Sequence, residues 1–219
     1  NTIAETITHR VHPVDASRKR NLLIDVMAQD SRRQTLIFSR TKHGANKLAE
    51  VLEGAGFRAA AIHGNKSQGA RTKALSDFKS GRITALVATD IAARGLDIPQ
   101  LPVVINFDLP MVAEDYVHRI GRTGRAGETG QAISLVSHDE SGLLRDIQRL
   151  IKQDVLIENF PGYEPSGALR LDAGAPRPVM GNRGGQRGGG GGGGQRTISS
   201  KPGAHRPHHA KPANTGAKP

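Results

Sequence analysis

Apolar residues follow two different periods along the first part of the chain, up to about residue 152. Continuous or alternating apolar runs are typical of strands, whereas apolar residues three or four positions apart indicate the buried face of a helix. The predicted strands are residues 6–14, 34–39, 58–64, 83–89, 102–108 and 130–137. The predicted helices are residues 15–30, 42–56, 67–81, 113–122 and 139–152.

This order of elements indicates the fold class. Strands that alternate with helices form a parallel sheet covered by helices on both faces, and the crossovers between them are right-handed. The continuous apolar runs 83–89 and 102–108 also match strands that are buried on both faces of such a sheet. We therefore predict an α/β domain that spans residues 1–160.

The composition changes after residue 160. Residues 161–219 are rich in Gly, Pro, Arg and Lys, and they include seven consecutive glycines from Gly188 to Gly194. Apolar residues are too sparse there to offset the lost chain entropy, so we predict a disordered, Gly-rich, basic tail. Three tail histidines have spacing that suits a metal ion, but the composition favours a solvated basic segment: His205, His208 and His209.

The charge balance narrows the choice of partner. The chain has a formal charge of +11, of which residues 1–160 carry +4 and residues 161–219 carry +7. A mildly basic body with a strongly basic tail indicates a polyanion, and nucleic acid ranks before a membrane surface. No apolar run reaches the roughly 18 residues that span a bilayer, no secretory signal opens the chain, and no cysteine is present. We expect a monomeric, cytoplasmic protein without a membrane partner or a metal site in its body.

Polar clusters follow four of the predicted strands, at residues 39–42, 63–71, 89–97 and 108–110. Ligands of open parallel sheets bind beyond the carboxyl ends of the strands. Several of these clusters also precede a helix, where free backbone N–H groups and the helix dipole attract phosphate. Any one cluster matches an ordinary loop, but four together predict an extended anion-binding site along one edge of the sheet.

The segment HRIGRTGR, residues 118–125, carries the densest positive charge of the body, with Arg119, Arg122 and Arg125 three positions apart. A glycine precedes each of the last two arginines, and a glycine inside a helix costs about 1 kcal/mol, which disfavours a plain solvated face. The chain contains no Gly-Lys pair, so it lacks the phosphate loop G-x-x-x-x-G-K-[S/T]. Arginines without such a loop suit a domain that reaches a nucleotide bound elsewhere and stabilises its transferred phosphoryl group.

Four segments resemble one family: LIFSRTK, IHGNKSQGAR, VATDIAARGLDIPQ and YVHRIGRTGRAGETG. They occur in the order and spacing of the second, C-terminal RecA-like domain of DEAD-box ATP-dependent RNA helicases, over about residues 1–165. The last motif begins with His, whereas other superfamily 2 helicases commonly begin it with Gln. The wording, including PGYEPS after the last helix, is most similar to the bacterial RhlE type.

The resemblance implies a RecA-like fold, ATP with Mg²⁺ as cofactor, and roles for the matching residues. Arg122 and Arg125 are implied to be catalytic arginine fingers that bind ATP, and His118 to couple the nucleotide site to the first domain. Asp97 is implied to bind the ribose of ATP. The implied contacts to the RNA backbone are Ser39, Arg40, Thr41, Gln68, Arg71, Thr89 and Gly95.

The chain matches only half of such an enzyme. It contains no counterpart of the first, N-terminal RecA-like domain, with its phosphate loop, Asp-Glu-Ala-Asp segment and Ser-Ala-Thr segment. We therefore expect the C-terminal half of a helicase that unwinds short RNA duplexes, inactive without that domain as its partner. Two alternatives stay open: a stand-alone RNA-binding or annealing module without ATPase activity, and a DNA-directed translocase domain, which the initial His disfavours.

Overall fold

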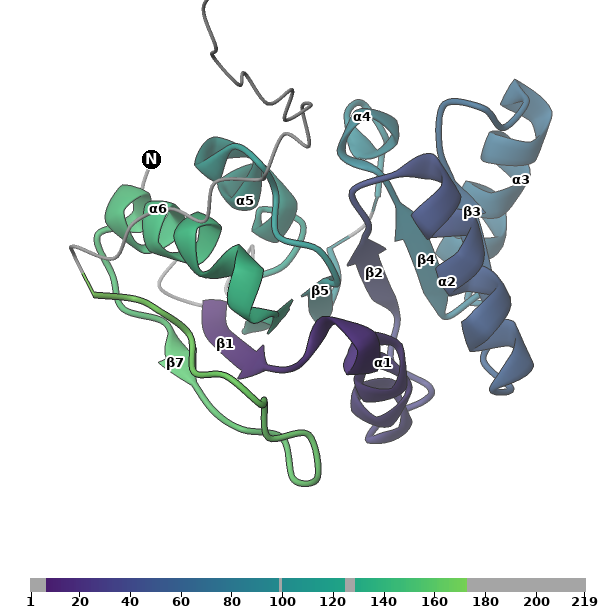
Figure 1. Cartoon of the computed structure of the whole chain (residues 1–219). Coiled ribbons are helices and arrows are strands. Elements are labelled where there is room, and N and C mark those ends of the chain that lie inside the picture. The colour runs from purple at the N-terminus through teal and green to yellow at the C-terminus, as the bar shows by residue number, and fades with distance from the viewer. Residues whose placement is uncertain (1–6, 99, 125–128, 173–219) are drawn as a thin grey trace, which may run out of the picture. The chain divides into compact units, whose positions relative to one another are not determined.

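The computed structural model describes residues 7–98, 100–124 and 129–172. Seven strands form one parallel sheet in the order β3-β4-β2-β5-β6-β1-β7 (Figure 1). The strands are β1 (Ile7–Pro13), β2 (Thr35–Phe38), β3 (Ala59–Ile62), β4 (Ala85–Ala88), β5 (Val103–Asn106), β6 (Gly130–Val136) and β7 (Leu156–Ile157). The predicted RecA-like α/β fold is confirmed, whereas Arg125 and the part of the predicted tail beyond residue 172, with its three histidines, lie outside the described residues.

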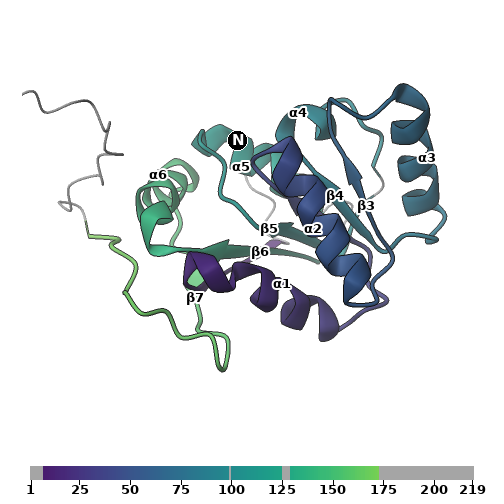
Figure 2. The same cartoon turned by 45° about the vertical axis from the view of Figure 1, so that its right-hand side comes forward.

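Helices cover both faces of the sheet. One face carries α1 (Lys19–Ala28) and α2 (Lys42–Gly54), as Figure 2 shows. The other face carries α3 (Gln68–Lys79), α4 (Asp90–Ala93), α5 (Ala113–Ile120) and α6 (Ser141–Ile151). Two short 3-10 turns precede α1 and α6, at Ala16–Arg18 and His138–Glu140. None of the helices in the described ranges combines the length and the apolar character needed to cross a membrane.

The alternation of side chains along the strands divides the core between the two faces. Ile37 and Ile105 point toward α1 and α2, where they pack with residues such as Leu48. Their neighbours Phe38 and Val104 point to the opposite face and pack with residues of α3. The central strands β2, β4 and β5 are buried along their whole length, which is why their sequences read as continuous apolar runs.

The packed body continues beyond the boundary at residue 160 that composition indicated. Phe160 and Tyr163 pack against the core on the α1 side, and the Tyr163 hydroxyl donates a hydrogen bond to Asp25 Oδ2 (2.5 Å). The Arg18 guanidinium lies 4.6 Å from the centre of the Tyr163 ring and donates to the carbonyl of Gly162 (2.5 Å). Two further leucines pack on the α6 side: Leu169 and Leu171. The segment 161–172 is thus tied to the domain on both faces of the sheet.

Candidate functional site

The edge of the sheet at which β2, β3, β4 and β5 end is called here the carboxyl rim. Ser39 follows β2 at this rim, and its hydroxyl donates to Asp108 Oδ2 (3.4 Å). The same carboxylate oxygen accepts the backbone N–H of Arg40 (2.9 Å). Thr41 caps α2, because its Oγ1 accepts the backbone N–H of Gly44 (2.9 Å). The loop 39–41 is therefore held from the end of β5 and from the first turn of α2.

Gly44 has a structural reason to be glycine at this point. A Cβ added there would lie 2.6 Å from Ser39 Oγ and 2.9 Å from Thr41 Oγ1. We expect Gly44→Ala to lower the free energy of unfolding by about 1–3 kcal/mol through overpacking, and to weaken the RNA binding that the family resemblance implies, because it displaces the loop. Gly54→Ala at the other end of α2, where a Cβ meets nothing within 4 Å, is the control and should stabilise by about 0.5–1 kcal/mol. Urea unfolding and RNA titration of both variants check this, and equal effects would contradict it.

The start of α3 lies at the same rim. Ser67 caps this helix by accepting the backbone N–H of Ala70 at its Oγ (3.2 Å). The Arg71 guanidinium donates to Oε1 of Gln68 (3.4 Å), and Gln68 is exposed. Both residues implied to contact RNA thus stand side by side on the first turn of a capped helix.

Buried His63 joins the α2 and α3 parts of the rim. Its Nε2–H donates to Asn46 Oδ1 (2.9 Å), and its Nδ1 accepts the backbone N–H of Asn65 (3.3 Å). Burial, with a smaller effect of the charges of Lys66 and Lys42, lowers the pKa of His63. The imidazole is therefore neutral at pH 7 and can keep its acceptor, which a second proton would remove.

The segment 89–97 runs from the carboxyl rim to the opposite end of the sheet. Thr89 follows β4 at the rim and is buried. Gly95 has φ +75°, a left-handed conformation that favours glycine and turns the chain away after α4. Asp97 is 93% exposed and pairs with Lys79 at the end of α3 (2.6 Å), which lowers the pKa of Asp97.

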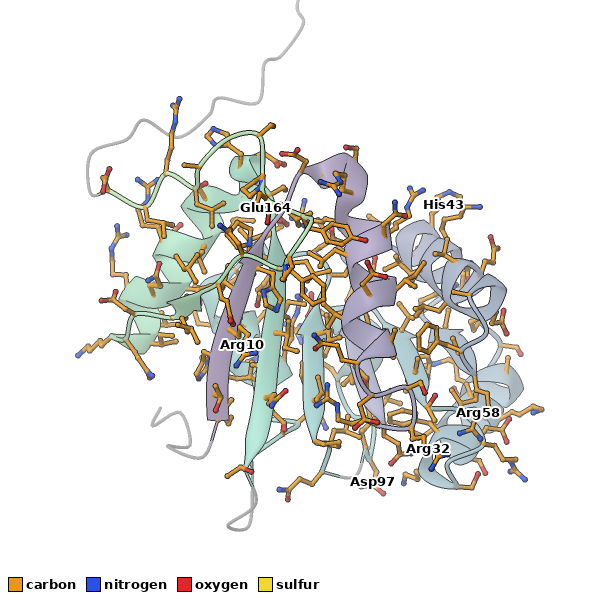
Figure 3. All side chains as sticks on the ribbon, turned by 90° about the horizontal axis from the view of Figure 1, so that it is seen from below. Arg10, Arg32, His43, Arg58, Asp97 and Glu164 are labelled. Atoms are coloured by element: carbon orange, nitrogen blue, oxygen red, sulfur yellow. The ribbon has the colours of Figure 1, made fainter. Side chains whose placement is uncertain are left out.

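Figure 3 shows the resulting separation. Asp97 lies at the same end of the sheet as Arg32 and Arg58, which precede β2 and β3, whereas His43 in the first turn of α2 lies at the opposite end. The sequence predicted that all four polar clusters lie along one edge of the sheet. The structure instead divides them, because α4 is only four residues long and the chain after it descends along the sheet.

Arg119 differs from the other arginines of the HRIGRTGR segment, because it is buried. Its guanidinium makes a bidentate ion pair with Asp90 (2.6 and 2.7 Å) and donates to Asn106 Oδ1 (3.0 Å) and to the carbonyl of Asp108 (2.6 Å). It also lies 4.8 Å from the centre of the Phe38 ring. Arg119 thereby connects α5 to the ends of β4 and β5.

This structural role of Arg119 was not predicted, because the spacing of Arg119, Arg122 and Arg125 indicated only a dense positive charge. A signal was present, since Tyr116 and Ile120 share the buried face of α5 with Arg119. A buried arginine requires an acidic partner nearby. Asp90 supplies it, but only the packing of α4 beside α5 reveals the pair.

Arg122 and His118 remain at the surface of the same face. The Arg122 guanidinium donates to the main-chain carbonyls of Leu96 (3.0 Å) and Ala93 (3.2 Å). The His118 side chain is 71% exposed, and its Nδ1 lies 3.6 Å from Asp115 Oδ1. The loop after α4 therefore fixes Arg122 while His118 projects from α5.

These two residues share a shallow hollow, called here the α5 hollow. It is lined by Phe38, Asp90, Arg94, Asp115, His118 and Arg122, among others. Its volume is about 20 Å³, which is enough for about one water molecule. The α5 hollow can present cationic groups to a phosphate, but it cannot enclose a nucleotide by itself.

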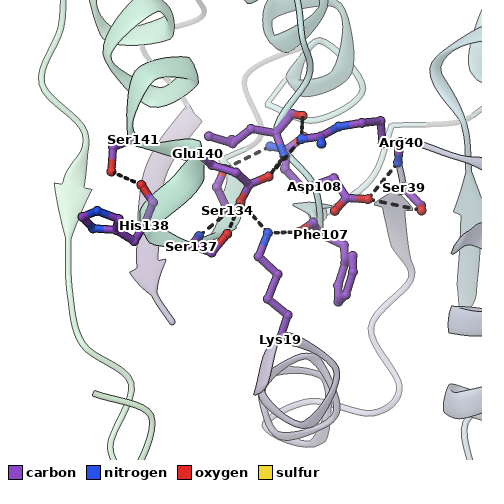
Figure 4. A network of polar contacts seen from close by, with 12 residues as sticks. Lys19, Ser39, Arg40, Phe107, Asp108, Ser134, Ser137, His138, Glu140 and Ser141 are labelled. Carbon is purple, nitrogen blue, oxygen red and sulfur yellow. Dashed lines mark hydrogen bonds and ion pairs between the residues drawn. The ribbon is translucent and has the colours of Figure 1, made fainter. Parts of the chain in front are cut away.

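A buried carboxylate ties the rim together, as Figure 4 shows. Glu140 Oε1 accepts the backbone N–H of Leu109 (3.1 Å) and a guanidinium N–H of Arg40 (3.2 Å). Glu140 Oε2 accepts from Lys19 Nζ (2.5 Å) and from the backbone N–H of Ser137 (3.1 Å). Glu140 thus joins α1, the loop 39–41, the loop before α5 and the end of β6. Within the described ranges, no group of three or more His, Cys, Asp or Glu is arranged to hold a metal ion.

Comparison with known proteins places the chain in a family. Residues 18–127 match the model of the helicase conserved C-terminal domain. The Escherichia coli DEAD-box protein SrmB, solved bound to regulator of ribonuclease activity A, matches with a TM-score of 0.71 and 35% identity over 76% of this chain and 98% of that chain. A DEAD box protein from the hyperthermophile Methanococcus jannaschii matches with a TM-score of 0.68 and 38% identity over 72% of this chain and 43% of that chain.

A third structure is itself a single domain. The C-terminal domain of the DEAD-box protein Dbp5 matches with a TM-score of 0.65 and 32% identity over 72% of this chain and 91% of that domain. The chain therefore corresponds to nearly all of two solved chains but to less than half of the M. jannaschii protein. From the family model and these identities, the chain belongs to the helicase conserved C-terminal domain family and contains the C-terminal domain of a DEAD-box protein.

Proposed function

We propose that the chain is the C-terminal half of an ATP-dependent RNA helicase. In this proposal Arg122 and Arg125 act as arginine fingers toward ATP and Mg²⁺ that an N-terminal RecA-like domain holds. The carboxyl rim supplies half of a groove for the RNA backbone. The observation that carries the proposal is the α5 hollow, which presents His118 and Arg122 on an open surface.

The size of the α5 hollow supports an arrangement in two domains. A cavity of about 20 Å³ cannot surround a triphosphate, and the chain contains no phosphate loop. A nucleotide on this surface therefore needs a second wall with backbone N–H groups and a metal ion. The role of this chain is then to bring fixed positive charge to the γ-phosphate when the two domains close.

The separation of the two ends of the sheet supports a division of labour. The rim carries Gln68, Arg71 and the loop 39–41, which suit a phosphodiester backbone. Asp97, the proposed ribose contact, lies at the other end of the sheet. Contacts of this kind position RNA without reading its bases. Closure of the two domains on one strand then separates a short duplex locally.

Two finer assignments belong to this proposal. The residues at the variable positions of the motifs support a bacterial RhlE-type enzyme. The segment PGYEPS contributes to that similarity, and its Tyr163 packs on α1. If the chain is instead a stand-alone RNA-binding module, the rim binds RNA in the same way and the α5 hollow has no role. Measurements of ATP hydrolysis distinguish the helicase half from the RNA-binding module.

The test is reconstitution. We expect residues 1–219 alone to hydrolyse no ATP, and a fusion to the first RecA-like domain of a DEAD-box protein to hydrolyse ATP with stimulation by RNA. The same first domain without this chain is the control, because it holds the phosphates but lacks the arginine fingers. RNA-stimulated turnover by residues 1–219 alone would contradict the proposal, and a fusion that binds RNA but never hydrolyses ATP would favour the RNA-binding module.

A further inference from the structure

A basic groove that is separate from the α5 hollow opens at the carboxyl rim, between the first turns of α1 and α2. Four side chains that can carry positive charge line it: Arg20, Arg40, His43 and Lys47. Phe107 and Leu48 contribute apolar surface to the same groove. Its volume is about 400 Å³, within the range of clefts that bind small molecules. It is called here the α1–α2 groove.

The positive charge of this groove is poorly neutralised by the protein. Arg40 shares the carboxylate of buried Glu140 with Lys19. In the described part of the chain, no ion pair joins Arg20 or His43, and Lys47 reaches only exposed Glu50 at 3.5 Å. Its one acidic lining residue is Asp108, which already accepts hydrogen bonds from the loop 39–41. The groove therefore keeps a net positive field that an anion can satisfy.

Three exposed cations elsewhere in the body are paired. Arg94 pairs with Asp115 at 2.6 Å, and Lys79 with Asp97 at 2.6 Å. Exposed Arg10 also reaches a carboxylate, that of Glu158, at 3.3 Å. The α1–α2 groove differs from these three surfaces, because Arg20 and His43 line it together and no ion pair in the described part of the chain joins either of them.

The helix ends beside the groove show the same bias. Helix α1 opens with Lys19 and Arg20, and neither α1 nor α2 has an acidic residue in its first turn. Helix α5 has the usual arrangement, with Glu114 and Asp115 in its first turn. Cations near a helix N-terminus oppose the helix dipole. Buried Glu140 compensates Lys19, so Arg20 is left without an internal reason for its position.

We infer that the α1–α2 groove binds the sugar-phosphate backbone of single-stranded RNA that continues past the rim. The inference rests on the proposed function, because Arg40 and Thr41 belong both to the proposed RNA contact and to the lining of this groove. A strand that leaves the loop 39–41 on the α1 side enters the groove directly. Arg20 and Lys47 there meet phosphates, while Phe107 offers apolar surface to a ribose or a base without selecting a sequence.

The test replaces Arg20 and Lys47 together by glutamine, which removes charge and keeps most of each side chain. RNA affinity is titrated at several salt concentrations with a single strand of about 12 nucleotides and the full chain of 219 residues. Two lost phosphate contacts lower the slope of log affinity against log salt by about 1.4. The matched control replaces Arg32 and Arg58 by glutamine, an equal charge change at the opposite end of the sheet (Figure 3). Its slope is expected to change by less than about 0.3.

The outcomes separate this inference from the proposed function. Arg71→Ala, which removes a proposed RNA contact at the rim, serves as a third variant. Equal salt slopes for the two double variants overturn RNA binding in the α1–α2 groove, whatever the effect of Arg71→Ala. If Arg71→Ala weakens RNA binding while the groove variant behaves as the control does, the proposed rim contact is supported and RNA binding in the groove is contradicted. If the salt slope falls in the groove variant and Arg71→Ala has no effect on RNA binding, the groove is supported and the proposed rim contact is contradicted. Thermal unfolding of each variant verifies that the fold is retained, as the exposure of all four replaced residues predicts.

Discussion

Alanine in place of Arg122 is expected to slow ATP hydrolysis in the two-domain fusion by about 10³–10⁵-fold, the usual contribution of an arginine finger. The affinity for ATP should change much less, because the interaction strengthens as charge develops on the transferred phosphoryl group. RNA binding without nucleotide should be nearly unchanged, since Arg122 lies in the α5 hollow and not at the rim. Single-turnover hydrolysis and RNA titration measure these quantities.

Two further variants exclude simpler explanations. Arg122 also donates to the carbonyls of Ala93 and Leu96, so its loss could disturb the loop after α4. Arg122→Lys keeps a charge and loses the guanidinium geometry, and we expect it to fold like the parent and to remain slow. Arg71→Ala should show the reverse pattern, with weaker RNA binding and hydrolysis that partly survives at saturating RNA. If Arg122→Ala hydrolyses ATP at the parent rate, the arginine-finger role is wrong.

Replacement of Arg119 by methionine is expected to destabilise the domain by about 3–5 kcal/mol, because it leaves Asp90 without the partner of a largely buried ion pair. The amide of Asn106 loses a hydrogen bond from the same guanidinium. Methionine fills a similar elongated volume, so the loss reports mainly on the ion pair rather than on a cavity. Urea unfolding of residues 1–219 measures the change. The slope of the free energy of unfolding against urea concentration should match that of the parent, which checks that unfolding remains two-state.

The control for this prediction is a pair at the surface. Arg10 pairs with Glu158 at 3.3 Å, and both side chains are 40% or more exposed, so Arg10→Met should cost no more than about 1 kcal/mol. A second variant, Arg119→Met with Asp90→Asn, should recover part of the stability because it removes the unpaired charge. A loss below about 1 kcal/mol for Arg119→Met would show that the pair is not structural.

Local periodicity was sufficient to predict the alternating elements and the parallel sheet. The strands β2, β4 and β5 are buried on both faces, so their sequences are apolar without interruption and can be read without a structure. Strand β7 could not be predicted in this way. It has only two residues, both exposed, and it exists because Leu156 and Ile157 meet the free edge of β1.

The motifs likewise indicated the family from the sequence alone, and the structure brings their residues to two surfaces. They did not separate those surfaces. Asp97 lies far from the rim because of the short helix α4 and the left-handed turn at Gly95. That path depends on packing against the sheet, which the order of residues in the motif does not express.

The α/β class, the family and the positive charge of the segment 118–125 could therefore be predicted from local sequence patterns. Which charges are internal and which are free depends on how the elements pack in three dimensions. Arg119 and Arg122 are both arginines of one motif, but Arg119 lies on the buried face of α5 against Asp90, while Arg122 follows the helix beside the α5 hollow. Glu140 and Lys19 lie 121 positions apart along the chain and form a buried pair. Such pairs form because a charge removed from water needs an opposite charge nearby, and the partner is chosen by proximity in space.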